Sequence, residues 1–120
     1  STKESLIGQP PTCWDIYAKG YSYQGEPILL TEFGGIGFEV SEQKGWGYSS
    51  VNSEKEFLEE YRRIMDAVYA SKGLWGYCYT QLTDVEQEIN GLVTYDRKSK
   101  CDLAEIKKIT DGYHRNRIEL

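Results

Sequence analysis

The stretch P-I-L-L-T-E-F-G-G, residues 27–35, decides the expected fold. Its residues 28–31 are apolar or β-branched, and such a short continuous run is typical of a buried strand in a parallel sheet. Glu32 follows directly, and a charge at the end of a buried strand is costly unless it has a partner or a function. In α/β barrels the C-terminal ends of the strands carry the catalytic residues. Glu32 is therefore the candidate catalytic residue, and Gly34 and Gly35 are expected to turn the backbone sharply without a Cβ that would crowd a ligand.

Composition and charge restrict the class of protein and its partners. With 120 residues one domain is expected, and 39% hydrophobic and 28% charged residues are ordinary for a soluble globular protein. The net charge of −5 argues against nucleic acid and anionic membrane as partners, since both need a basic patch. No stretch approaches the roughly 20 apolar residues of a transmembrane helix. The 10 tyrosines and 3 tryptophans fit either core packing or the stacking of sugar rings, and their number does not decide between the two.

Cysteine and histidine are too few and too scattered for a metal site. Cys13, Cys78 and Cys101 are widely and irregularly spaced, and the single histidine is His114. An odd number of cysteines at such spacing fits neither a disulfide framework nor a zinc site. No metal and no organic cofactor are therefore expected, and Cys78, which lies in an apolar run, is expected to pack in the core. Residues 1–3 do not resemble a native N-terminus, so the compartment stays open, and the free cysteines favour the cytoplasm.

Glycine and proline divide the chain into a lead-in and a folded unit. Residues 1–26 are loop-rich, and residues 27–120 are expected to form a single domain. The connection at 34–52 is rich in glycine and carries Trp46 in an aromatic cluster. Loops of this length are often functional. Two interpretations of Trp46 stay open: part of a substrate lid, or the anchor of a surface loop.

A helix is predicted after this loop, and a second strand after the helix. Ser53 and Glu56 form an S-x-x-E capping box, and Gly73 is expected to end the helix. Between them apolar residues recur on one helical face: Phe57, Leu58, Tyr61, Ile64, Met65, Val68 and Tyr69. Residues 74–80 are predicted as a second buried strand, with Trp75 in the core. A strand, a helix and a strand make a βαβ unit, in which the two strands pair in parallel.

The rest of the chain completes a second β/α unit. A polar segment, residues 81–100, contains the turn signal Asn90-Gly91. A last helix is predicted from Asp102, and Asp111-Gly112 is expected to end it. The fold class is therefore α/β, with long loops after both strands. A (β/α)8 barrel needs about 250 residues, so this chain is expected to be a fragment that supplies the last quarter of a TIM barrel, two strands with their two helices.

Two segments resemble one family of enzymes. The stretches 27–35 and 76–96, the latter reading G-Y-C-Y-T-Q-L-T-D-V-E-Q-E-I-N-G-L-V-T-Y-D, resemble the C-terminal part of the catalytic barrel of glycoside hydrolase family 2. That family contains β-galactosidases, β-glucuronidases and β-mannosidases. The resemblance runs over about residues 26–110 and covers strands seven and eight of the barrel with their helices. T-E-F-G alone is moderately specific, whereas the segment 81–97 is long and much more specific. The resemblance implies a β-glycoside substrate, with the remainder of the barrel as a partner.

The resemblance also implies roles for single residues. Glu32 matches the nucleophile of a retaining glycosidase, which works by double displacement with a second carboxylic acid about 5–5.5 Å away. Tyr79 falls where many members carry a tryptophan that forms a platform for the sugar. Trp46 is a further candidate for substrate binding. Asp84, Glu86 and Asn90, in the loop after the second strand, have two open roles: binding of sugar hydroxyls and organisation of the loop.

One element of the family pattern is absent. The general acid/base of the family is the glutamate of an Asn-Glu pair, and this sequence contains no such dipeptide. The isolated chain is therefore expected to be inactive on ordinary glycosides and to self-associate through its open strand edges. A different class of function stays open, a non-catalytic module that binds carbohydrate or protein. A Rossmann-type nucleotide-binding function is excluded, because no G-x-G-x-x-G follows a strand.

Overall fold

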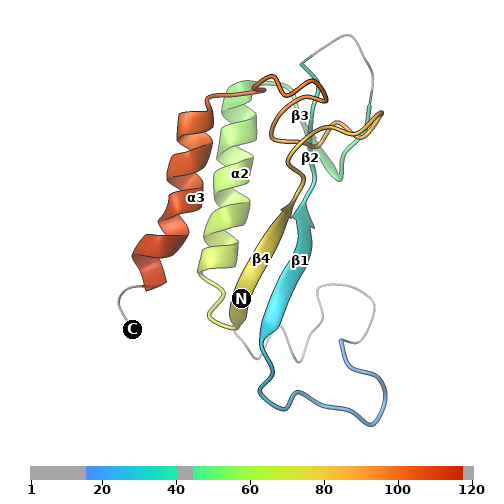
Figure 1. Ribbon diagram of the computed structural model, residues 1–120, viewed down its shortest axis with the longest axis vertical. Helices are drawn as coiled ribbons and strands as arrows, with labels where there is room; N and C mark the ends of the chain where they lie inside the picture. Colours follow the sequence, from blue (N-terminus) through green and yellow to red (C-terminus); the bar gives the residue numbers. More distant parts are fainter. Residues whose placement is uncertain (1–15, 41–44, 118–120) are drawn as a thin grey trace.

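The computed structural model describes residues 16–40 and 45–117, which form two small parallel sheets and two helices (Figure 1). The elements follow in the order β1 (Ile28–Gly34), β2 (Ile36–Phe38), β3 (Ser49–Val51), α2 (Glu54–Tyr69), β4 (Leu74–Thr80) and α3 (Leu103–Arg117). Residues 16–26 contain no helix or strand, and the lead-in before them lies outside the described residues together with Cys13. The expected α/β class is confirmed at this level. Neither described helix is long and apolar enough to cross a membrane.

Strands β1 and β4 pair in parallel and α2 connects them, so the predicted βαβ unit is confirmed. Leu29 is the partner of Gly76, and Phe33 is the partner of Tyr79. The register shifts between Leu30 and Phe33. Figure 1 shows α2 beside this pair and α3 beyond α2, so the helices lie on one side of the sheet. Both strands point toward the end of the molecule where β2 and β3 lie.

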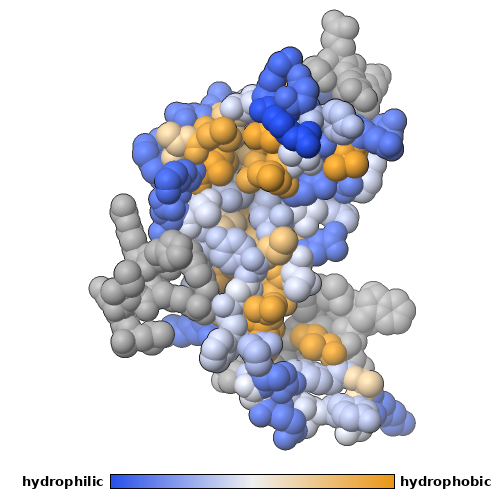
Figure 2. Space-filling model, in the orientation of Figure 1, coloured by the Kyte–Doolittle hydropathy of each residue, from blue (hydrophilic) through white to orange (hydrophobic). Residues whose placement is uncertain are grey.

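The expectation that both strands are buried on both faces is wrong for this chain. Leu29 and Trp75 keep 59% and 65% of their surface exposed, and Cys78 is also exposed. Trp75 and Cys78 are therefore not core residues, contrary to the sequence prediction. The reason is architectural, because within the described residues the helices cover the pair from one side. Apolar side chains accordingly reach the surface over part of the β1–β4 pair (Figure 2).

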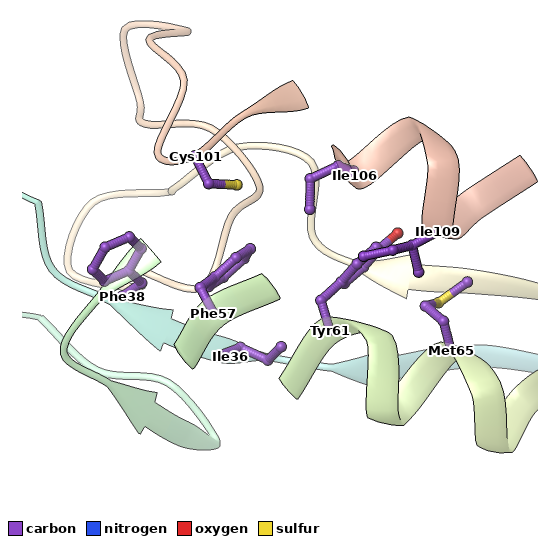
Figure 3. Packing of buried hydrophobic residues seen from close by; sticks show 8 residues of the cluster. All are labelled: Ile36, Phe38, Phe57, Tyr61, Met65, Cys101, Ile106 and Ile109. Atoms are coloured by element: carbon purple, nitrogen blue, oxygen red, sulfur yellow. The ribbon is translucent and has the colours of Figure 1, made fainter. Parts of the chain in front are cut away.

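The core lies where α2 meets α3 and the short strand β2 (Figure 3). Ile106 and Ile109 of α3 lie opposite Tyr61 and Met65 of α2. The buried cluster consists of Ile36, Phe38, Phe57, Tyr61, Met65, Cys101, Ile106 and Ile109. The apolar face predicted for the helix is confirmed, since its buried residues are Phe57, Tyr61, Met65 and Val68. Burial of this stripe, more than helix propensity, stabilises α2.

Ser53 caps the start of α2 as predicted, but the Glu56 carboxylate bonds to the residue before the cap, and the end of the helix does not follow the prediction. Ser53 accepts a hydrogen bond from the Glu56 N–H at 3.2 Å, and the Glu56 carboxylate accepts one from the Asn52 N–H at 2.8 Å. The helix is capped at its other end by Ala70, which has right-handed helical dihedrals. Gly73 lies beyond this cap and is buried next to β4, so the expectation that it ends the helix is wrong. No left-handed residue is needed at this end, because the chain turns through a backbone hydrogen bond from Leu74 to Ser71.

Helix α3 starts as predicted and continues further than predicted. The Asp102 carboxylate accepts a hydrogen bond from the Ala104 N–H at 2.8 Å, as an N-cap does. The helix then runs through Asp111 and Gly112, so the expectation that this pair ends it is wrong. A glycine inside a helix costs only about 0.5–1 kcal/mol relative to alanine. Two contacts offset this cost. Gly112 packs against the Tyr69 ring, and Asp111 forms an ion pair with Lys107 one turn earlier.

Candidate functional site

Glu32 is the fifth of the seven residues of β1, with its side chain exposed to solvent. The strand continues through Gly34, so the carboxylate stands two residues before the C-terminal end of the strand instead of at the end. The hydroxyl of Tyr48 donates a hydrogen bond to Glu32 Oε1 over 3.5 Å. The candidate catalytic carboxylate is thus accessible and has an aromatic hydroxyl as neighbour.

The two glycines after Glu32 turn the backbone, as predicted, but they make room for tyrosine rings. Gly34 and Gly35 have φ angles of +102° and +67°, a region that favours glycine. A Cβ on Gly34 would lie 2.2 Å from the Tyr79 ring, and one on Gly35 would lie 2.0 Å from the Tyr48 ring. The expectation that the missing Cβ atoms leave space for a ligand is therefore corrected, since these two side chains fill that space.

An exposed aromatic pair stands beside Glu32. The Trp46 and Tyr48 rings meet edge to face, with centroids 6.0 Å apart and planes at 80°. They retain 51% and 66% of their surface exposed. The structure therefore brings Trp46, a sequence candidate, near Glu32 through Tyr48. Sequence reasoning did not assign Tyr48 to the site, although the G-W-G-Y segment that contains it was a visible signal.

The loops that follow β1 and β4 are joined to each other. The Trp46 N–H donates to the Gln87 carbonyl at 2.8 Å, and the Ile89 N–H donates to the Trp46 carbonyl at 2.9 Å. The Phe38 N–H also donates to the Ile89 carbonyl, at 3.1 Å. Of the two interpretations of Trp46, these bonds favour the anchor over the free lid. The connection is also more regular than expected, because it contains β2 and β3 paired in parallel.

Asp84 organises the second loop from inside. Its carboxylate accepts hydrogen bonds from Lys100 Nζ at 2.6 Å and from the Gly91 N–H at 2.8 Å. The Lys100 side chain is fully buried, and its Nζ also donates to the Ile89 carbonyl at 2.8 Å. The Asp84 side chain is itself 90% buried. These contacts occupy the carboxylate and favour the loop-organising role over direct binding of sugar hydroxyls.

Asn90, like Asp84, is buried and hydrogen-bonded within the second loop. Its side chain is fully buried. The amide oxygen accepts from Gln81 Nε2 at 2.7 Å, and Nδ2 donates to Glu88 Oε1 at 3.1 Å. Asn90 therefore connects the start of the loop to its middle, and its geometry likewise favours organisation of the loop.

Tyr79 lies on the core side of the β1–β4 pair. Its ring meets Phe33 edge to face at 5.5 Å and Tyr61 edge to face at 5.0 Å. Burial raises the pKa of the Tyr79 hydroxyl well above its usual value. Glu32 is exposed to solvent, whereas the Tyr79 ring packs with Phe33 and Tyr61. The structure therefore does not bring the Tyr79 ring together with Glu32, and its placement does not support the sugar-platform role.

A hollow of about 500 Å³ lies in the loop region. Half of its polar lining residues are carboxylates, namely Glu39, Asp84, Glu86 and Asp96, and Lys98 lies beside them. Glu32 does not line this hollow. Within the described part of the chain, no group of three histidine, cysteine or acidic side chains is arranged to hold a metal ion.

Comparison with known proteins adds no relative. Neither a scan against protein-family models nor a search of curated proteins found a match to this sequence.

Proposed function

We propose that the chain supplies the last quarter of the (β/α)8 catalytic barrel of a retaining β-glycosidase similar to glycoside hydrolase family 2. In this proposal Glu32 is the nucleophile. The observation that carries the proposal is the position of Glu32, an exposed carboxylate near the C-terminal end of a parallel strand, in contact with Tyr48. The resemblance of the segments 27–35 and 76–96 to that family supports this class of reaction.

Retention of configuration requires a carboxylate that attacks the anomeric carbon and forms a covalent glycosyl-enzyme. A rigid strand suits this task because it holds the carboxylate in a fixed direction. The second carboxylic acid, which protonates the leaving oxygen, is then contributed by another part of the barrel. Aromatic rings bind the C–H faces of sugars, so the exposed Trp46, which meets Tyr48 edge to face, is a proposed contact for a sugar bound near Glu32.

The open side of the β1–β4 pair is the proposed contact with the remainder of the barrel. Leu29 and Trp75 are exposed there, and in the described residues each of the two strands is paired along one edge. Unpaired strand edges recruit other strands. We therefore expect the isolated chain to self-associate, with an average mass in sedimentation equilibrium that rises with concentration. A mass that stays at the monomer value over a hundredfold range of concentration would contradict this expectation.

Covalent labelling tests the role of Glu32. The purified chain is incubated with dinitrophenyl 2-deoxy-2-fluoro-β-glycosides of galactose, glucose, mannose and glucuronic acid, and its intact mass is measured. The fluorine slows breakdown of the glycosyl-enzyme, and the activated leaving group needs no acid catalyst. We expect one sugar adduct on the wild-type chain and none on Glu32→Gln, because an amide is a poor nucleophile. The proposal is wrong if no sugar gives an adduct, or if Glu32→Gln is labelled as fast as the wild type.

The second candidate function is a non-catalytic carbohydrate-binding module. The exposed Trp46–Tyr48 pair favours it, because such a pair binds sugars without any chemistry at Glu32. Titration with unreactive sugars separates the two functions. Sugar binding without covalent labelling, lost in Trp46→Ala and kept in Glu32→Gln, would favour the binding module.

A further inference from the structure

The contact between Tyr48 and Glu32 joins two segments that lie sixteen residues apart. Glu32 belongs to β1, whereas Tyr48 directly precedes β3. The Tyr48 hydroxyl donates to Oε1 of the carboxylate at 3.5 Å. This contact turns Oε1 toward the Tyr48 hydroxyl and does not involve the other carboxylate oxygen, Oε2.

The Tyr48 ring is held in place from several directions. Its Cδ2 atom occupies the space where Gly35 would carry a Cβ, only 2.0 Å from the ideal Cβ position. The Tyr48 N–H donates to the Gly35 carbonyl at 2.8 Å. The ring also meets Trp46 edge to face. The hydroxyl is therefore aimed by contacts that do not involve Glu32.

The backbone of Gly47, directly before Tyr48, packs tightly against β2. A Cβ on Gly47 would lie 2.5 Å from the Gly37 nitrogen and 2.9 Å from the Gly35 carbonyl oxygen, so this segment is pressed directly against β2. The backbone of Trp46 is bonded to Gln87 and Ile89 of the second loop. The segment that carries Tyr48 is therefore bonded to the second loop and packed against β2.

We propose that Tyr48 is the positioning residue of the nucleophile: its hydroxyl holds Glu32 Oε1 so that Oε2 is presented to the anomeric carbon. This inference rests on the proposed function of Glu32. In the labelling reaction Oε2 forms a bond to the anomeric carbon. The bond from that carbon to the aryl oxygen breaks, and its electron pair leaves on dinitrophenolate, which needs no proton. Tyr48 takes no part in bond making; it restricts the directions from which Glu32 attacks.

The test measures the kinetics of labelling in Tyr48→Phe. Phenylalanine keeps the ring that fills the space over Gly35 and removes only the hydroxyl. We expect the first-order rate constant for adduct formation to fall about tenfold, because misorientation of a reacting group costs rate. The dissociation constant of the reagent, obtained from the concentration dependence, should stay the same. A mere loss of structure would instead weaken reagent binding or change the circular dichroism spectrum.

The matched control is Tyr95→Phe, since Tyr95 is also 66% exposed and lies in the second loop. It should label at the wild-type rate. If Tyr48→Phe also labels at the wild-type rate while Glu32→Gln is not labelled, the positioning role of Tyr48 is overturned, and the role of Glu32 as nucleophile is kept. An equal fall of the rate constant in both phenylalanine variants overturns the positioning role as well. If the wild-type chain gives no adduct, both the proposed function of Glu32 and the positioning role of Tyr48 are wrong.

Discussion

Lys100→Met is expected to destabilise the chain by about 3–5 kcal/mol, because it breaks a buried ion pair and leaves one charge behind. The Lys100 side chain is fully buried, and its Nζ lies 2.6 Å from Asp84 Oδ1. After the substitution, the Asp84 carboxylate keeps the hydrogen bond from Gly91 but has lost its counter-charge. The loss approaches the whole stability of many small domains. Urea unfolding followed by circular dichroism measures it as a lower midpoint.

Two comparisons isolate the buried charge as the cause. The pair Lys98–Asp96 has a similar separation of 2.7 Å but is exposed, so Lys98→Met should change the stability by less than about 1 kcal/mol. The double variant Asp84→Asn/Lys100→Met contains neither charge and should recover most of the loss. An effect of Lys100→Met no larger than that of Lys98→Met would show that the ion pair does not hold the second loop together.

Gly91→Ala is expected to destabilise the chain by about 3 kcal/mol, at the upper end of the range for overpacked sites. The added Cβ would lie 2.3 Å from the Asp84 nitrogen and 2.6 Å from the Val93 carbonyl oxygen. Both are backbone atoms, so no side chain can rotate away to relieve the clash. The backbone would have to shift, and the hydrogen bond from the Gly91 N–H to Asp84 would be strained. Urea unfolding again provides the measurement.

Gly112→Ala is the matched control for this prediction. Its added Cβ would lie 3.6 Å from the Tyr69 ring, which is ordinary contact, and the position is inside α3. Alanine is favoured over glycine there, so we expect a gain of about 0.5–1 kcal/mol. If both alanine variants shifted the midpoint in the same direction, the close approach at Gly91 would not be the cause.

Local patterns predicted the α/β part of the fold well. The S-x-x-E cap and the apolar stripe of α2 are interactions between residues close in sequence, so the sequence alone shows them. The parallel pairing of β1 and β4 followed from the order strand, helix, strand. The three-residue strands β2 and β3 were missed because such short segments carry no periodic pattern. Burial of β1 on both faces was also wrong, because an apolar run does not tell how many layers cover a strand.

The candidate site was predictable only in part. Glu32 stood out because a charge directly after an apolar run is unusual. Asp84 and Asn90 could not be assigned, since their partners Lys100 and Gln81 lie nine to sixteen residues away. Tyr48 was missed because its relation to Glu32 arises from the turn at the two glycines and from the pairing of β2 with β3. Such contacts depend on tertiary structure, which single-residue patterns do not encode.

Azide rescue of Glu32→Gly tests directly whether Glu32 is a nucleophile. Removal of the carboxylate leaves space at the anomeric carbon for a small anion to attack in its place. With azide and the dinitrophenyl β-glycoside of the sugar that labels the wild type, we expect an α-glycosyl azide, detected by NMR, from the variant and none from the wild-type chain. If the variant gives no such product, or gives a β-configured azide, Glu32 is not the nucleophile.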